Sequence, residues 1–396
     1  MKAALTIALT LSLFAAIAPP PAQPQPSSSA SPLVKEISLF RDGAGRVAWS
    51  AQGDWLAFDA RDPEHGNYQL WVMKRDGTFE RCLTCEPLDL RRENCINPTW
   101  HPSGDWIVFQ LQSQAKRLGF GPVELATGDR GLWSEIEVIR RDGRGFWQLT
   151  RVHENGGTVL DPQFSFEGDQ ILWSERVRSR VGRWGTWALR VAQFRGGAVP
   201  RLAKPRTFEP GEQRLYLSGS SFTPDDQGAL IAGNLDPGQP ENGMDVYRLA
   251  FEGGAVERLT HTPRGWDERA TYTVKGDRIL WVSASEITLR DVGRAVRGAN
   301  GTRPEGVVNT TPGGREPALP IDLLRDLWVM NADGTNQERL TFFNEPSSRE
   351  SLKAAIVDDF AQSPDGGEIL AHVVWSADGE AREGLYLIRL DESFRR

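Results

Sequence analysis

The sequence repeats one unit six times between residues 47 and 391. The first copy reads VAWSAQGDWLAF at 47–58 and continues with YQLWVMKRDGTFERCLT at 68–84. Later copies begin near residues 98, 162, 220, 270 and 360. A repeat of this length indicates an architecture of similar supersecondary units placed side by side, rather than one irregular core.

Each complete copy contains four short apolar or alternating runs bounded by turn residues, a pattern typical of strands. The turn between the first two runs carries a glycine in five copies, at Gly53, Gly104, Gly168, Gly276 and Gly366. Asp-Gly or Gly-Gly pairs mark the turn between the last two runs, where hairpins need a positive φ. Four-stranded sheets repeated radially are propeller blades, so we predict an all-β, six-bladed β-propeller of antiparallel blades.

The sixth copy, 360–373 with 383–391, is one strand short. The segment VKEISLF at 34–40 is strand-like and precedes the first copy without a partner of its own. We therefore expect this N-terminal strand to complete the last blade and close the ring, because an open ring would leave an unpaired sheet edge. An open β-solenoid is the alternative.

The units WSxxGDWLAF and LWVMxxDGTxxERLT resemble the WD-type propeller repeat of the TolB-like family, over about residues 46–391. The resemblance implies the propeller fold. It is a poor marker of function, because such propellers serve many unrelated roles. TolB itself carries an α/β domain before its propeller, where this sequence has a linker and one strand. We expect a TolB-like propeller rather than TolB.

The amino terminus resembles an export signal. Lys2 precedes a largely apolar run from Ala3 to Ala18, shorter than the roughly 20 residues of a spanning helix. Cleavage after Ala18 or after Ala22 is compatible with the small residues there, and an uncleaved anchor is a third possibility. We expect a signal peptide at 1–22, a Pro/Ser-rich linker at 23–33 and one propeller at 34–396, in a periplasmic or secreted protein.

The charge balance narrows the choice of partners. The formal net charge is −7, and charged residues make up 25% of the chain without a long basic run. These values argue against nucleic acid or anionic lipid as the main partner. We expect a monomer without a membrane span after signal removal, whose partner is a protein or an envelope polysaccharide.

A ring of residues is expected where the chain enters each blade. Strand order places the tight turns on one face and the variable connections, including the long segment 282–325, on the other, which we call the loop face. Seven residues before each first-turn glycine or its equivalent stands a position that should line the central channel at this face. These positions are Arg46, Asn97, Asp161, Gly219, Arg269 and Asp359. The charged and amide members could bind a ligand or partner, or they could satisfy one another and water as in any polar channel.

Three cysteines form a C-x2-C-x9-C cluster at Cys82, Cys85 and Cys95. Zinc would need a fourth ligand, and His101 is too far along its strand. Glu86 follows Cys85, so the haem-attachment motif is absent. In an exported protein a disulfide is the default, and we predict Cys85–Cys95, with Cys82–Cys95 as the alternative.

Other motifs point away from catalysis. The sequence has no G-x-S-x-G elbow, no P-loop and no calcium-binding loop, and its five histidines are scattered singly. Most tryptophans recur at blade positions and should pack, whereas Trp133, Trp184, Trp187 and Trp266 lie nearer loops and could stack on sugar or peptide.

We predict no catalytic residue, metal or cofactor, and an exported propeller that acts as a protein-interaction or ligand-binding module. The alternative is a glycan-active lyase or hydrolase that uses a metal or carboxylates such as Asp161 and Asp359 at the channel mouth.

Overall fold

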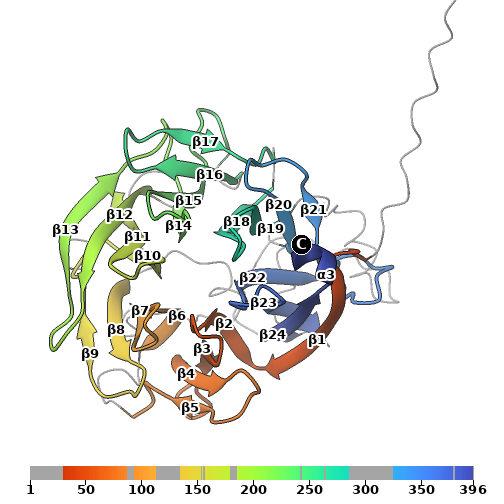
Figure 1. Cartoon of the computed structure of the whole chain (residues 1–396), viewed down its shortest axis with the longest axis horizontal. Coiled ribbons are helices and arrows are strands. Elements are labelled where there is room, and N and C mark those ends of the chain that lie inside the picture. Colours follow the sequence, from red (N-terminus) through yellow and green to blue (C-terminus); the bar gives the residue numbers. More distant parts are fainter. Residues whose placement is uncertain are drawn as a thin grey trace, which may run out of the picture.

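The computed structural model describes residues 30–86, 93–112, 134–152, 154, 157–178, 185–240, 243–262, 265–284, 324–377 and 380–395. Their strands form six four-stranded sheets with antiparallel neighbours. Figure 1 shows the sheets arranged radially around a central axis. The chain is therefore a six-bladed β-propeller, as the repeats predict. Within the described ranges, no helix has the length and apolar character needed to cross a membrane.

The strands of each blade run in order from the axis outward. Blade 1 contains β2 (Ala44–Trp49), β3 (Trp55–Arg61), β4 (Tyr68–Lys74) and β5 (Arg81–Cys82). Blade 2 contains β6 (Asn94–Trp100), β7 (Trp106–Gln112), β8 (Ser134–Arg140) and β9 (Phe146–Gln148). Blade 3 contains β10 (Val159–Phe164), β11 (Gln170–Arg178), β12 (Thr186–Arg195) and β13 (Arg201–Phe208). Blade 4 contains β14 (Leu217–Phe222), β15 (Gly228–Gly233), β16 (Asp245–Ala250) and β17 (Val256–Arg258). Blade 5 contains β18 (Asp267–Tyr272), β19 (Arg278–Ser283), β20 (Asp326–Asn331) and β21 (Glu338–Arg339).

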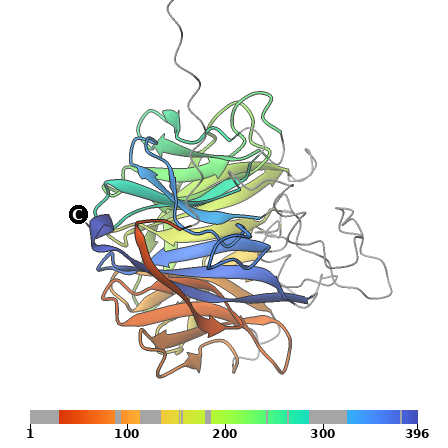
Figure 2. The same ribbon diagram turned by 90° about the vertical axis from the view of Figure 1, so that its right-hand side faces the viewer.

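Blade 6 combines both ends of the described chain. It contains β22 (Ala355–Gln362), β23 (Glu368–Ala377), β24 (Glu380–Leu390) and, outermost, β1 (Val34–Asp42). β1 pairs with β24 in antiparallel fashion, with Val34 opposite Leu390 and Asp42 opposite Gly384. The four-residue helix α3 (Glu392–Arg395) follows β24 on the turn side of the ring, which Figure 2 shows edge-on. That the β1–β24 pairing is what closes and stabilises the ring stays a prediction.

The hydrophobic core is divided among the blade interfaces. Buried side chains form six clusters, and each cluster draws mainly on two neighbouring blades. Trp106 of blade 2 packs with Trp173 of blade 3, for example, and Trp281 packs with Trp328. The packing role predicted for the recurrent tryptophans is confirmed. Trp187 and Trp266 are also buried, so they cannot stack on a ligand at the surface, and Trp133 and Trp184 lie outside the described residues.

The turns between the first and second strands interlock around the other face. The five predicted glycines there have φ between +72° and +78°, and Asp226 takes this place in blade 4 with φ of +56°. Gln52 Nε2 donates to the Pro102 carbonyl at 3.0 Å, and His101 Nε2 donates to the Gly168 carbonyl at 3.0 Å. Phe166 N–H donates to Asp226 Oδ1 in the same way, so hydrogen bonds join the turns of blades 1 to 4 in sequence. This favours a rigid turn face and leaves the loop face as the place for a variable site.

Removal of residues 1–42 tests the role of β1. The deletion should unpair β24 and expose the part of the blade 6 core that β1 covers, lowering the melting temperature by about 3–4 °C, which corresponds to about 2–3 kcal/mol in a domain of this size. A chain that begins at residue 30 is the control and should melt as the full chain does. Equal melting temperatures for the two truncated chains would contradict the closing role of β1.

Candidate functional site

Every innermost strand carries an irregularity at the predicted channel-mouth position. The register of pairing shifts within β2, β6, β10, β14, β18 and β22. Asn97, Asp161 and Arg269 adopt positive φ values of 59°, 53° and 57°. A β-bulge of this kind redirects a side chain out of the regular pleat. Six bulges at one level of the ring therefore aim these side chains at the axis.

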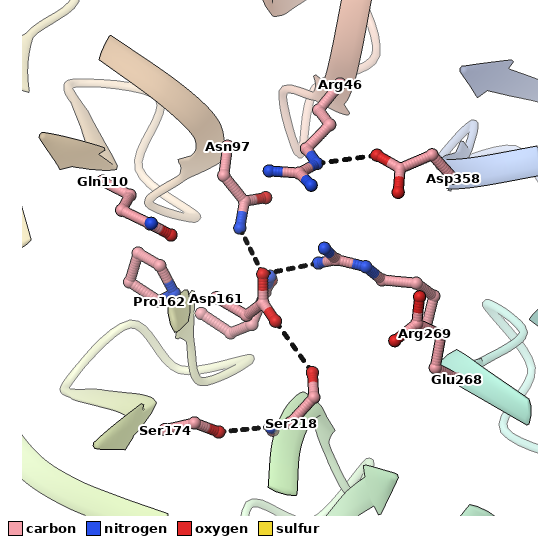
Figure 3. Close-up of polar contacts among 12 residues, drawn as sticks. Arg46, Asn97, Gln110, Asp161, Pro162, Ser174, Ser218, Glu268, Arg269 and Asp358 are labelled. Carbon is pink, nitrogen blue, oxygen red and sulfur yellow. Dashed lines mark hydrogen bonds and ion pairs between the residues drawn. The ribbon is translucent and has the colours of Figure 1, made fainter. Parts of the chain in front are cut away.

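Four of the five predicted site residues come together in a buried polar network, and Asp161 is its centre (Figure 3). Asp161 Oδ1 accepts from Asn97 Nδ2 at 2.6 Å and from Arg269 Nη1 at 2.7 Å. Its Oδ2 accepts from Ser218 Oγ at 2.8 Å. These donors come from blades 2, 5 and 4, so one carboxylate of blade 3 joins four blades.

Arg46 belongs to a second part of the network. Its Nε donates to Asp358 Oδ2 at 2.9 Å, and Arg325 Nη2 lies 3.6 Å from Asp358 Oδ1. Arg325 also pairs with Glu268. The predicted ring member Asp359 does not form this pair, because the bulge between Val357 and Asp359 turns Asp358 toward Arg46 instead.

Asp359 remains half-buried and forms no hydrogen bond or ion pair with another described residue. Burial raises the pKa of the Asp359 carboxyl to about 6, against the opposing charges of Arg269 and Arg46. Near neutral pH it is thus a mostly ionised carboxylate beside two guanidinium groups, both of which are committed to other carboxylates.

A second ring of polar residues supports the bulges. It lies at the fifth position of the second strand in four blades and consists of Asp59, Gln110, Ser174 and His372. Asp59 accepts from the backbone N–H groups of Arg46 at 3.0 Å and Asn97 at 2.8 Å. This second ring was not predicted from the sequence, although one polar residue inside an otherwise apolar strand was the available signal.

His372 links Asp358 to the outer part of blade 6. Its two ring nitrogens lie 3.3 Å from Asp358 Oδ2 and from Glu383 Oε2. Burial opposes a charge on this imidazole, but hydrogen bonds to the two carboxylates outweigh it and raise the pKa of His372 to about 9. Burial would also raise the pKa of Asp358, yet Arg46 and His372 together hold it well below its usual range.

The disulfide differs from the prediction. The structure joins Cys82 to Cys85, with Cα atoms 5.8 Å apart, and Cys95 is a free, buried cysteine. The predicted Cys85–Cys95 pair and the alternative Cys82–Cys95 pair were both wrong. Cys95 lies on β6 and packs into the apolar interface of blades 1 and 2, whereas Cys82 and Cys85 meet across a tight turn after β5.

Two of the remaining histidines have local roles. His101 holds the interlocked turns, and His65 Nδ1 lies 2.8 Å from Asp62 Oδ2. His153 lies outside the described residues. In the described part of the chain, no three His, Cys, Asp or Glu side chains are grouped so that they could hold a metal ion. Most of the 282–325 connection also falls outside the described residues.

Comparisons with known proteins support the propeller fold but do not indicate what the protein binds or catalyses. No family model matches the chain. The uncharacterized protein YidR of Escherichia coli (strain K12) is 30% identical over 129 residues, which are 33% of this chain and 25% of YidR. This match spans about a quarter of the length of that curated relative.

Among solved structures, a TolB-assigned protein from Agrobacterium tumefaciens is 14% identical with a TM-score of 0.51, covering 88% of this chain and 100% of the other. An oligogalacturonate lyase in complex with manganese is 12% identical with a TM-score of 0.48, covering 91% of this chain and 98% of the other. At such low identities the likeness concerns the fold alone, because one propeller fold carries many functions.

The ion pair between Asp161 and Arg269 can be tested by a double-mutant cycle. Asp161→Ala should lower the free energy of unfolding by about 3–5 kcal/mol, because it leaves the buried guanidinium of Arg269 without its partner. In the cycle of Asp161→Leu, Arg269→Met and the double variant Asp161→Leu/Arg269→Met, the double variant should cost less than the sum of the two single variants, as measured by urea unfolding. Arg389→Ala, in an exposed pair with Glu36, is the control and should cost no more than about 1 kcal/mol. Equal costs for Asp161→Ala and Arg389→Ala would contradict the account.

The raised pKa of His372 predicts a pH dependence of stability. The folded pKa of about 9 lies above the unfolded value of 6.5, so the stabilisation by charged His372 is complete below pH 6.5 and is lost as the pH rises toward 9. We expect the stability difference between the wild type and His372→Gln to shrink over that window, measured by urea unfolding at several pH values. A difference that stays constant from pH 6 to pH 10 would show that His372 is neutral in the folded protein.

Proposed function

We propose that this protein is an exported, non-catalytic β-propeller that binds a protein partner or an envelope ligand on its loop face, around the channel mouth. The observation that carries the proposal is the incomplete polar network at that mouth. Asp359 has no hydrogen-bond partner among the described residues, and Ser220 Oγ, Ser221 Oγ and Arg269 Nε are buried without one. Such groups favour a bound water or a polar group of a ligand.

The location of the unsatisfied groups supports binding at the loop face. The interlocked turns restrain the opposite face, and the connections on the loop side lead directly into the bulged inner strands. Rigid scaffolds commonly carry binding residues on the connections that differ among repeats.

Export rests on the apolar amino-terminal run and gains support from the disulfide. Disulfides such as Cys82–Cys85 persist in oxidising compartments, which include the periplasm and the extracellular space. A periplasmic or secreted location is therefore part of the proposal.

The hydrogen bonds that the Asp161 carboxylate already accepts argue against a catalytic role for this residue. A general acid or base needs an oxygen within reach of substrate, whereas both oxygens of Asp161 accept hydrogen bonds from neighbouring blades and the side chain is buried. Structural use of this carboxylate favours binding over glycan cleavage.

Site-specific photo-crosslinking in the expressing cells tests the proposal. A benzophenone amino acid placed at His261, an exposed residue on the connection that leads to β18, should give a discrete crosslinked adduct. The same group at Val274, which is 57% exposed on the turn face of the same blade, is the matched control and should give none. Asp359→Asn should reduce the adduct at His261.

Two outcomes would overturn the proposed function. One is an adduct pattern that does not favour His261 over Val274. The other is stoichiometric metal in the purified protein together with turnover of an oligosaccharide panel, which would favour the lyase or hydrolase alternative.

A further inference from the structure

The charges of the chain are strongly segregated. Residues 176–208 contain eight arginines, one lysine and no aspartate or glutamate, a local charge of +9. Since the whole chain has a net charge of −7, the remainder carries −7 − 9 = −16. The segment forms the end of β11 and all of β12 and β13, which are the outer part of blade 3 on the rim of the ring (Figure 1).

These cations are largely unpaired. Arg180 and Arg183 lie outside the described residues. Of the other seven cations, only Arg190 forms an ion pair with a described residue, Glu175, at 2.8 Å. Burial lowers the pKa of the Arg176 guanidinium, and no nearby carboxylate offsets this effect. Outer arginines of other blades differ, since Arg248 pairs with Glu257 and Arg389 pairs with Glu36 and Glu368.

One like-charged pair is built into the sheet itself. Arg195 on β12 lies directly opposite Arg201 on β13. Like charges at directly opposed positions destabilise an antiparallel pair. A sequence that keeps such a local conflict commonly does so at a functional surface.

Two grooves flank the basic strands. The first, of about 590 Å³, lies between blades 2 and 3 and is lined by four arginines, Arg151, Arg176, Arg178 and Arg190, with Glu175 as its carboxylate. The second, of about 380 Å³, lies toward blade 4, where Lys204 and Arg206 stand beside the amide side chains of Gln170 and Gln193. Asp169 and Asp226 also line this groove, and Asp226 is held by hydrogen bonds from two backbone N–H groups. The surface thus combines guanidinium and ammonium groups with neutral hydrogen-bonding groups.

The edge strand β13 is suited to contacts through its side chains rather than through backbone pairing with another strand. Lys204 has a positive φ of 49° and precedes Pro205, and the pairing with β12 is irregular at this point. A bulge with proline blocks the addition of another strand to the edge. No large apolar side chain of β12 or β13 is exposed, and the exposed apolar side chains beside these strands are two single valines, Val177 and Val199. Among the described residues, this surface therefore lacks the aromatic anchor typical of protein interfaces and of membrane insertion.

From these observations we propose that the outer surface of blade 3 binds an anionic polysaccharide that carries carboxylate groups. Arginine forks pair well with carboxylates, and the amide groups between them can bond sugar hydroxyls. Several weak contacts along one chain add up through multivalency. This site is separate from the channel mouth and does not depend on the function proposed for it.

Binding to alginate oligosaccharides, whose sugars each carry a carboxylate, tests the inference by calorimetry at several salt concentrations. The wild type should bind them, bind neutral dextran far more weakly, and lose affinity as salt rises. Arg201→Glu/Lys204→Glu should weaken binding by about tenfold or more, the loss expected for two screened ion pairs replaced by repulsion. The control Lys35→Glu/Lys353→Glu changes the net charge equally on exposed positions of blade 6 and the loop before it, and should stay within about twofold of the wild type.

Three results would overturn the inference: no binding of alginate at low salt, equal weakening by the two double variants, or tighter binding of poly-glutamate or of phosphatidylglycerol vesicles than of alginate. If Arg201→Glu/Lys204→Glu melts earlier than the wild type, the neutral variant Arg201→Gln/Lys204→Gln replaces it and should still weaken binding several-fold. Channel-mouth changes such as Asp359→Asn should leave alginate binding unchanged.

Discussion

The carboxylate of Asp161 is the point on which the centre of the ring depends. It accepts hydrogen bonds from side chains of three other blades, in a part of the protein where it is 2% exposed. A buried carboxylate is costly unless such partners satisfy it, so the inner strands are stable only when the four blades keep their positions. The bulges at Asn97, Asp161 and Arg269 follow from the same requirement, because a regular strand would direct these side chains into the blade interfaces.

The same network separates the part of the mouth that holds the inner strands from the part that we propose to bind a ligand. Arg46, Arg269 and Arg325 neutralise Asp358, Asp161 and Glu268, and this core of paired charges holds the inner strands. Asp359 stands beside the core without a hydrogen bond or ion pair to another described residue. A propeller can thus keep a rigid charged centre and still offer an ionised group to a ligand. The outer strands of blade 3 differ, because cations gather there and, among the described residues, only Arg190 pairs with a carboxylate, that of Glu175.

Much of the fold follows from the sequence because each blade is encoded locally. The six repeats, the turn glycines and the strand-like segment 34–40 have counterparts in the six sheets, the positive φ values and β1. The positions of Arg46, Asn97, Asp161 and Arg269 at the channel followed from their fixed distance to a turn glycine. The hydrogen-bond partners of these residues could not be predicted in this way, because the pair Arg269–Asp161 joins residues that are 108 apart in sequence and lie on blades that are not neighbours. The exchange of roles between Asp358 and Asp359 depends on one bulge, and the Cys82–Cys85 bond depends on which way Cys95 faces.

The central claim is that Asp161 couples the inner strands of several blades, and hydrogen–deuterium exchange in the Asp161→Ala variant measures this coupling directly. If the account is right, backbone amides should exchange faster than in the wild type in β6, β14 and β18 as well as in β10, because each of these strands supplies a bond to Asp161 or carries it. Faster exchange confined to β10, with β6, β14 and β18 unchanged, would contradict it.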